Sequence, residues 1–114
     1  MNVAILGLGR FGSQLAAELV RTGVEVLAVD RDPDRVNDMV QSVLLAAEGD
    51  VTDVDFLESI SLHSYSTVVV AIGSDMATSV LVTLTVKQRL HLEHVVAKSS
   101  SAEHTRALEL AGAD

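Results

Sequence analysis

The chain has 114 residues, a formal net charge of −8 and no cysteine. This length suits one domain with its own core and leaves no room for a second domain of full size. The acidic charge disfavours binding to nucleic acid, which depends on clustered Lys and Arg, and the lack of cysteine excludes a disulfide framework. No apolar run approaches the roughly 18 residues of a transmembrane helix. We therefore expect one cytoplasmic domain without direct membrane insertion.

The first 30 residues have the pattern of a strand, a glycine turn, a helix and a second strand. Residues 2–6 are apolar, residues 10–22 repeat apolar side chains at helical spacing, and residues 24–30 form another apolar run. The turn between the first strand and the helix, residues 7–12, reads G-x-G-x-x-G. In this context the motif predicts a nucleotide-binding turn, because the amides at the helix start attract a phosphate.

The rest of the chain alternates between helices and strands. The predicted segments are a helix capped by Asp32 with Val36, Met39 and Val40 buried, a strand at 42–46, a helix capped by Thr52 or Asp53, a strand at 67–72, a turn at 73–75 that includes Ser74, a helix at 75–90, a strand at 94–98 and a helix at 101–111. This order predicts an α/β fold, a Rossmann-like doubly wound parallel sheet of at least five strands with helices on both faces. The helix at 75–90 is apolar on more than one face, which favours self-association.

The acidic residue that ends the second strand is the next candidate for ligand binding. Asp30 is placed to accept hydrogen bonds from the ribose hydroxyls of an adenosine, and its charge repels a 2′-phosphate. Arg31 beside it weakens that repulsion, so NAD(H) or an adenine nucleotide is favoured over NADP. Arg10 lies in the first helical turn, where a cation is unfavourable unless an anion is near, and so predicts a phosphate contact.

Other candidates follow from the rule that ligands bind at the carboxyl ends of parallel strands. Residues 50–52 and 72–74 follow the third and fourth predicted strands, and Lys98 ends the fifth. Thr52 and Gly73 are explained almost equally well as capping and turn residues. The candidate ligand-binding residues are Gly7, Gly9, Arg10, Phe11, Gly12, Asp30, Arg31, Asp50, Val51, Ile72, Gly73 and Lys98.

Catalytic and metal-binding patterns are weak in comparison. Residues 7–12 contain no P-loop lysine, and Tyr65 is not followed by a lysine four residues later. His91 and His94 straddle a predicted loop, and His104 is expected at the surface or at the edge of the ligand, without a hydroxyl partner. We therefore predict a binding protein that is not an enzyme and holds no metal. The alternative that stays open is the coenzyme-binding domain of an NAD-dependent oxidoreductase.

Several strings together resemble the N-terminal RCK domain of TrkA- and KtrA-type potassium-uptake regulators. They are VAILGLGRFG at 3–12, VLAVD at 26–30, VAIG at 70–73, Ala97-Lys98 and LAGAD at 110–114. The similarity covers essentially all of residues 1–114, which it identifies as one nucleotide-binding domain. The family continues beyond this point into a sixth strand and often a C-terminal ligand domain.

The resemblance implies a gating subunit that binds NAD(H) or ATP/ADP. Its partner is a membrane potassium transporter or channel subunit, to which it binds at the inner face of the cell membrane, and its copies form dimers or larger rings through the fourth and fifth helices. By matching positions, the resemblance puts Arg10 on the phosphates, Asp30 on the ribose, Asp50 and Val51 near the adenine, and Lys98 on the distal phosphate side. Some ATP-responsive members carry a neutral amide where this chain has Asp50, so the choice between NAD(H) and ATP/ADP stays open.

Overall fold

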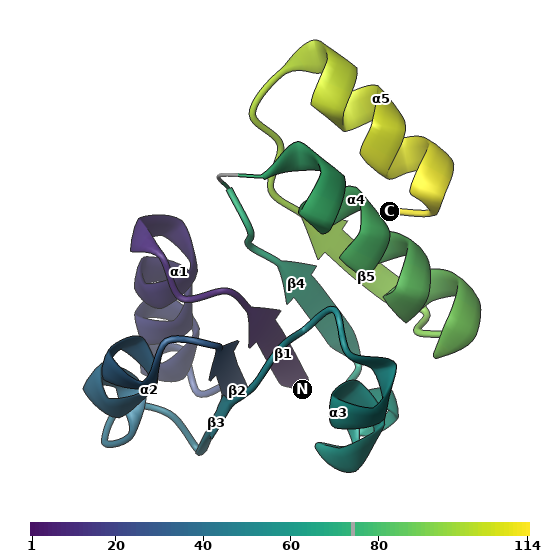
Figure 1. The fold of residues 1–114 in the computed structure, drawn as a ribbon. Coiled ribbons are helices and arrows are strands. Elements are labelled where there is room, and N and C mark those ends of the chain that lie inside the picture. The colour runs from purple at the N-terminus through teal and green to yellow at the C-terminus, as the bar shows by residue number, and fades with distance from the viewer. Residues whose placement is uncertain (74) are drawn as a thin grey trace.

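The computed structural model describes residues 1–73 and 75–114, so Ser74 and its part in the predicted turn lie outside the described residues. Five parallel strands form one sheet in the order β3-β2-β1-β4-β5. The strands are β1 (Asn2–Leu6), β2 (Glu25–Asp30), β3 (Leu45–Glu48), β4 (Thr67–Val70) and β5 (His94–Ala97). The predicted doubly wound parallel sheet is confirmed (Figure 1).

Helices cover both faces of this sheet. They are α1 (Arg10–Arg21), α2 (Pro33–Met39), α3 (Val54–Ser59), α4 (Met76–Leu84) and α5 (Ala102–Ala111). Figure 1 shows α1 and α2 on one side of the sheet, α3 and α4 on the other, and α5 alongside α4. Alternation along β1 explains the two cores: Val3 and Ile5 are buried with Ala16 and Met39 on one face, whereas Ala4 and Leu6 are buried with Leu57 and Val82 on the other.

The helix predicted at 75–90 is confirmed in its extent. Asp75 caps α4, and a single π-helical turn, Thr85–Arg89, continues it. This turn directs Lys87 onto Asp114, with 2.9 Å between Nζ and Oδ2, and the Asp114 N–H donates to the Val95 carbonyl at 2.8 Å. Asp114 is therefore bound to β5 through Val95, and Lys87 binds the same carboxylate. Among the helices described, none combines the length with the apolarity that a bilayer-spanning helix requires.

Two predicted features are wrong. The third strand was expected at 42–46, but β3 begins at Leu45, because the N–H groups of Ser42 and Val43 both donate to the Met39 carbonyl and hold this stretch in a turn off α2. Val40 is 53% exposed instead of buried, since α2 ends at Met39 and the chain turns away from the sheet. Smaller shifts occur where β2 starts one residue late and where β4 and β5 end one or two residues early.

The strand order fixes where a ligand has room. From β1 the chain passes to β2 on one side and later to β4 on the other side. The connections leaving the carboxyl ends of these strands therefore diverge, with α1 on one face and α4 on the opposite face. Such a reversal point leaves a crevice at the carboxyl edge of an open α/β sheet.

Candidate functional site

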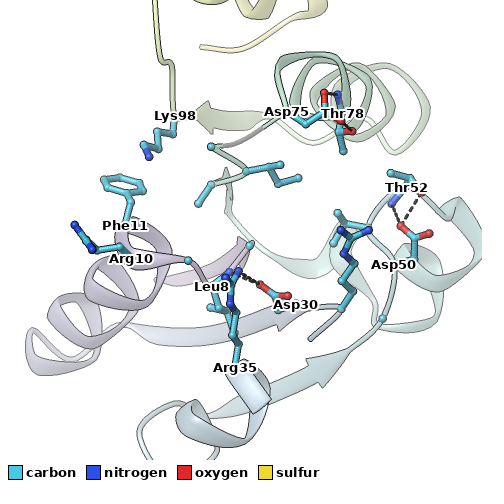
Figure 2. A pocket seen from close by; sticks show the side chains of 18 residues that line it. Leu8, Arg10, Phe11, Asp30, Arg35, Asp50, Thr52, Asp75, Thr78 and Lys98 are labelled. Atoms are coloured by element: carbon cyan, nitrogen blue, oxygen red, sulfur yellow. Dashed lines mark hydrogen bonds and ion pairs between the residues drawn. The ribbon is translucent and has the colours of Figure 1, made fainter. Parts of the chain in front are cut away.

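A cavity of about 580 Å³ lies at this edge, between the loops that follow β1, β2, β3, β4 and β5 (Figure 2). Its lining residues are Gly7, Leu8, Gly9, Arg10, Phe11, Asp30, Arg31, Arg35, Gly49, Asp50, Val51, Thr52, Ala71, Ile72, Gly73, Asp75, Thr78 and Lys98. All the candidate residues named from the sequence are among them except Gly12. The volume falls within the range of small-molecule and cofactor sites, roughly 300–1,000 Å³.

The N-terminus of α1 is the most distinctive wall of the cavity. Its N-cap is Gly9, so no side chain accepts a hydrogen bond from the first-turn amides, and no acidic residue lies in that turn. In the described part of the chain every other α-helix has a side-chain cap, provided by Asp32, Asp53, Asp75 or Ser101. The α1 amides and the positive end of its dipole are therefore available to an anion.

Two other glycines let the turn pass close to the sheet. Gly7 has φ +107°, and a Cβ there would lie 2.8 Å from the Ala71 carbonyl oxygen. A Cβ at Gly12 would collide with the Gly7 carbonyl oxygen, because the first turn of α1 folds directly onto the preceding loop. Gly12 therefore allows helix α1 to pack closely on the loop at Gly7, and it does not line the cavity.

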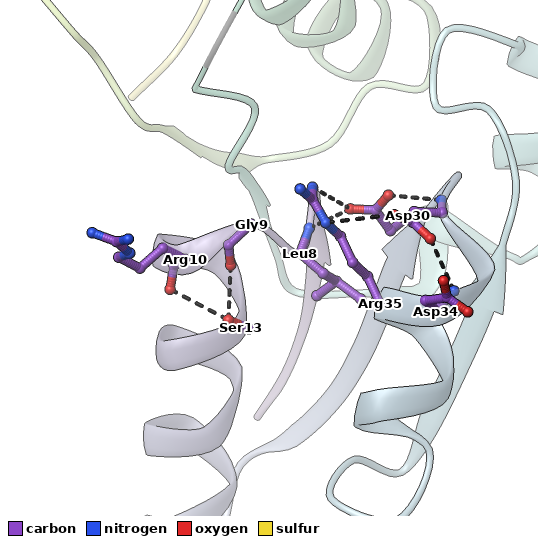
Figure 3. A network of polar contacts seen from close by, with 8 residues as sticks. Leu8, Gly9, Arg10, Ser13, Asp30, Asp34 and Arg35 are labelled. Atoms are coloured by element: carbon purple, nitrogen blue, oxygen red, sulfur yellow. Dashed lines mark hydrogen bonds and ion pairs between the residues drawn. The ribbon is translucent and has the colours of Figure 1, made fainter.

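Asp30 is held at the end of β2 by two backbone donors (Figure 3). Its Oδ2 accepts the Leu8 N–H at 2.7 Å, and its Oδ1 accepts the Asp32 N–H at 2.9 Å. The residue is only 7% exposed, so these bonds fix the carboxylate in one orientation. A carboxylate offers about four acceptor sites, so two remain for a pair of adjacent hydroxyl groups.

Arg35 is a cavity residue that the sequence interpretation missed. It extends from the first turn of α2 back towards Asp30, with Nη1 3.8 Å from Oδ2, while its Nε lies 3.8 Å from Asp32 Oδ2. The same Nη1 is 4.0 Å from the position of a Cβ on Gly9 (Figure 3). The guanidinium therefore lies between the Asp30 carboxylate and the open end of α1, half-exposed and without a close hydrogen bond to either aspartate.

Lys98 lines the cavity from the end of β5 and lies beside Phe11 in Figure 2. Its Nζ is 5.7 Å from the centre of the Phe11 ring, within the range of a cation–π contact. A Cβ on Gly73 would lie 2.9 Å from the same Nζ. Glycine at this position therefore leaves room for the lysine side chain to cross the loop after β4. Lys98 therefore joins the β5 side of the cavity to the first turn of α1 (Figure 2).

Positive charge is concentrated around the cavity although the chain as a whole is acidic. Four of the eight Lys and Arg residues of the chain line it, namely Arg10, Arg31, Arg35 and Lys98. Since these side chains come from different loops of the sequence, the fold collects them at one site. This arrangement favours an anionic ligand over a neutral one.

Two further aspartates at the cavity are already paired with neighbouring threonines. The Thr52 hydroxyl and N–H both donate to Asp50, at 2.6 and 2.9 Å, and these bonds lower the pKa of Asp50. The Thr78 hydroxyl donates to Asp75 at 2.6 Å and, together with the Thr78 and Ala77 N–H groups, lowers the pKa of Asp75. Both carboxylates are thereby held ionised in fixed positions.

Among the described residues, none that lines the cavity is a histidine, tyrosine or cysteine. Its titratable groups are carboxylates with fixed hydrogen-bond partners, arginines and one lysine. The described residues also include no group of three or more His, Cys, Asp or Glu able to hold a metal ion. The arrangement is suited to holding a phosphorylated ribonucleoside by hydrogen bonds and charge.

The sequence matches the family model of the TrkA-N domain over residues 3–114. The chain belongs to the TrkA-N domain family. Ktr system potassium uptake protein C of Bacillus subtilis is 38% identical over 111 residues, which are 97% of this chain and 50% of that protein. Ktr system potassium uptake protein A of the same organism is 37% identical with the same coverage. This TrkA-N domain thus spans about half the length of these curated relatives.

Solved structures share the fold of the TrkA-N domain. The GsuK channel bound to NAD is 28% identical, with a TM-score of 0.82 over 99% of this chain and 20% of that one. GsuK bound to ADP gives the same identity and TM-score over 99% of this chain and 29% of that one. The TrkA-N domain of the inner membrane protein YbaL from Escherichia coli has a TM-score of 0.90 over 99% of this chain and 83% of that one, but at 14% identity it shows the fold alone.

One prediction about this TrkA-N domain is corrected outside the cavity. His104 was expected at the surface or at the edge of the ligand, without a hydroxyl partner, yet it is 1% exposed and does not line the cavity. Its Nε2 lies 2.6 Å from Ser79 Oγ, and its Nδ1 lies 3.1 Å from both the N and the Oγ of Ser100. Local spacing does not indicate this contact, because Ser79 is 25 residues away and belongs to another helix.

Proposed function

We propose that this TrkA-N domain is the nucleotide-binding regulatory domain of a potassium transport system and senses NAD(H) or ATP/ADP. The observation that carries the proposal is the uncapped N-terminus of α1, which shares its cavity with the fixed carboxylate of Asp30. Together these groups match a phosphate joined to a ribose. The relatives named for potassium uptake and the GsuK structures bound to NAD and ADP support this assignment.

The proposed position of the nucleotide follows the length of the cavity. The phosphates contact the amides at the start of α1 and the guanidinium of Arg10. The ribose hydroxyls donate to Asp30, and the adenine lies towards Arg31, Asp50 and Val51. The far end of the ligand reaches Ile72, Gly73 and Lys98, where the lysine meets a further phosphate or the second half of a dinucleotide.

Calorimetric titration with NADH, NAD, ATP and ADP tests the binding proposal. The most specific version of this experiment compares the affinity for ADP with that for 2′-deoxy-ADP, which lacks one ribose hydroxyl. We expect the wild-type chain to prefer ADP by about tenfold, because charge-assisted hydrogen bonds contribute roughly 1.5–3 kcal/mol each. Asp30→Asn keeps an acceptor for one backbone N–H and removes the charge, so this preference should largely disappear.

Two results would count against the binding proposal. If none of the four nucleotides produced a titratable heat, the cavity would not be a nucleotide site. If Asp30→Asn retained the full preference for ADP over its 2′-deoxy analogue, the ribose would lie elsewhere. Circular dichroism of the variant provides the control for correct folding.

Regulation requires that the nucleotide bind two arrangements of the assembled protein with different affinities. In our proposal this domain lies in the cytoplasm, at the inner face of the membrane, and its assembly acts on a membrane potassium transporter or channel subunit. A 100-fold affinity difference between two arrangements corresponds to about 2.7 kcal/mol, which is enough to change the populations of two states substantially.

The surface proposed for self-association is an exposed apolar strip on α4. Met76, Leu81 and Leu84 are 42%, 50% and 43% exposed, whereas Val82 on the opposite side of the helix is fully buried. A second copy of the chain would remove this apolar area from water. X-ray scattering with and without a saturating nucleotide should show a change in dimer shape or in oligomer size, and identical curves would contradict the regulatory role.

The composition of the cavity favours binding over catalysis. Hydride transfer by an NAD-dependent oxidoreductase needs an acid–base group beside the substrate carbonyl. The lining residues that the structure describes include no histidine or tyrosine, and each of their carboxylates already has hydrogen-bond partners from the chain. We therefore expect no steady NADH oxidation with small carbonyl substrates, and turnover in that assay would instead favour the oxidoreductase alternative.

A further inference from the structure

His104 joins two parts of the chain that carry cavity residues, although it lies outside the cavity. The imidazole projects from the first turn of α5 and is 1% exposed. On one side it contacts Ser79 in α4, and on the other side it contacts Ser100, which precedes α5. The buried ring thus connects α4 to the segment that precedes α5.

The hydrogen bonds around His104 define its protonation state. The Ser100 backbone N–H is a donor, so the nitrogen that it reaches, Nδ1, accepts and carries no proton. Nε2 then carries the ring proton and donates to Ser79 Oγ at 2.6 Å. The Ser79 hydroxyl in turn donates to the Met76 carbonyl at 3.0 Å, which completes the chain of bonds. Because the ring donates to Ser79, it does not act as a base that activates this serine.

Both ends of this chain of bonds lie close in sequence to the cavity. Ser79 belongs to the turn of α4 that also carries Thr78, and the Met76 carbonyl follows Asp75 directly; both Thr78 and Asp75 line the cavity. Ser100 is two residues beyond Lys98, which also lines the cavity. His104 therefore connects the α4 wall of the cavity to the segment that carries Lys98.

We infer that His104 is a positioning residue for the distal end of the proposed nucleotide site. As a neutral ring with its proton on Nε2, it holds the Lys98–Ser100 segment against the first turn of α4 and so sets the distance between Lys98 and the α4 wall. The inference rests on the proposed function, because Lys98 is the group through which His104 acts on the ligand.

The ring nitrogens provide a direct test that needs no substitution. ¹⁵N NMR of histidine-labelled wild-type chain distinguishes a protonated ring nitrogen from an unprotonated one. We expect the His104 ring to carry its proton on Nε2 and to exchange that proton slowly with solvent, because the ring is buried. A His104 signal with the proton on Nδ1, or one that is positively charged at pH 7, would contradict the assigned bonds and overturn the inference.

A double-mutant cycle then tests whether His104 affects ligand binding by positioning Lys98. The probe is ATP or NADH, whichever the wild-type chain binds more tightly, with AMP as the shorter reference ligand. His104→Gln keeps an amide donor for Ser79 and loses the acceptor for Ser100, whereas His104→Asn keeps an acceptor near Nδ1 and loses the donor. We expect each variant to bind the long ligand about threefold to tenfold more weakly and AMP as before.

The decisive comparison is made in the Lys98→Ala background. If His104 acts by placing Lys98, neither His104 variant should weaken binding further once the lysine is absent. Equal losses with and without Lys98, or equal losses for AMP and the long ligand, would show a general structural role and overturn the inference. Should the His104 variants fail to fold, Ser79→Ala removes the α4 partner alone and enters the same cycle. A wild-type chain that binds no nucleotide would instead refute the proposed function itself.

Discussion

Two helices begin at the same cavity, and their N-termini differ in chemistry. The first turn of α1 has glycine as its cap and an arginine as its first residue. The first turn of α4 has Asp75 as its cap, which accepts from the N–H groups of Ala77 and Thr78 and from the Thr78 hydroxyl. Both ends have the same dipole, yet only the end of α1 lacks an anion supplied by the chain itself.

This difference indicates where an external anion is bound. At α4 the carboxylate of Asp75 already satisfies the amides, and its charge repels a second anion. At α1 no side chain accepts from the first-turn amides, and Arg10 adds a positive charge where the dipole alone would disfavour one. The comparison therefore assigns the phosphates to α1 and leaves α4 as a wall of the cavity.

Gly9→Asp should give the largest effect, because it makes α1 resemble α4. Gly9 has an extended backbone, and the nearest atom to a Cβ there is Arg35 Nη1 at 4.0 Å, so aspartate fits. Two like charges about 4 Å apart repel by roughly 4 kcal/mol at an effective dielectric constant of 20, so ADP binding should weaken by more than about 100-fold.

Thermal unfolding measures the stability of the Gly9→Asp variant, and calorimetric titration measures its affinity for ADP. The variant should be at least as stable as the wild type, because aspartate is a good N-cap. Gln14→Glu, on the exposed surface of α1, is the control for added charge and should leave the affinity nearly unchanged. Unaltered ADP binding by Gly9→Asp would show that the phosphates do not lie at α1.

Arg10→Ala should have the second largest effect, a loss of about tenfold in ADP affinity. A charge-assisted hydrogen bond to phosphate contributes roughly 1.5–3 kcal/mol, reduced here because the side chain is exposed. Arg21→Ala at the other end of the same helix is the matched control, since Arg21 pairs only with Glu18, at 2.8 Å, in the described residues. If calorimetry gave the two variants equal affinities for ADP, Arg10 would not contact the ligand.

Arg35→Ala should change the affinity by about threefold, because the guanidinium is half-exposed and no atom of Asp30 lies within hydrogen-bond distance of it. The loss should be larger at low ionic strength than at high ionic strength, since salt screens exposed charges. Titration of ADP at two salt concentrations measures this difference. An affinity that is independent of salt in both proteins would rule out an electrostatic role for Arg35.

Asp75→Asn should have the smallest effect on affinity, within about twofold, and should act on stability. Hydrogen bonds, first from the Thr78 side chain, lower the pKa of Asp75 below 3.8 in the folded chain. A lowered pKa stabilises the fold above the ordinary value and ceases to do so as pH falls through the folded value. The free energies of unfolding of wild type and variant, measured in urea, should therefore differ at pH 7, and the difference should shrink as the pH falls below 3.8. A difference that persists in acid would contradict this cause.

Local patterns in the sequence were enough to predict much of the fold and of the cavity. Residues 7–12 and Asp30 are linked by one strand–helix–strand unit, so their spacing alone indicates that they meet. Lys98 and residues 50–51 and 72–73 followed from the rule that ligands bind at the carboxyl ends of parallel strands.

The residues that sequence reasoning missed depend on contacts between distant elements. Arg35 reaches the cavity only because its long side chain folds back from α2 along Asp30. Asp75 was predicted only as the end of a turn and the start of a helix, and Thr78 was not singled out, because nothing in their spacing shows that α4 begins at the cavity. The burial of His104 requires the packing of α5 against α4. The start of β3 was misplaced because apolar Val43 and Leu44 resemble a strand while the backbone is still turning.

Amide chemical shifts of ¹⁵N-labelled chain during ADP titration test the assignment of the phosphates most directly. The account predicts large shifts for the N–H groups of Arg10, Phe11 and Gly12 and much smaller shifts for those of Ala77 and Thr78, which donate to Asp75. Large shifts at Ala77 and Thr78 with unchanged signals at the start of α1 would contradict it.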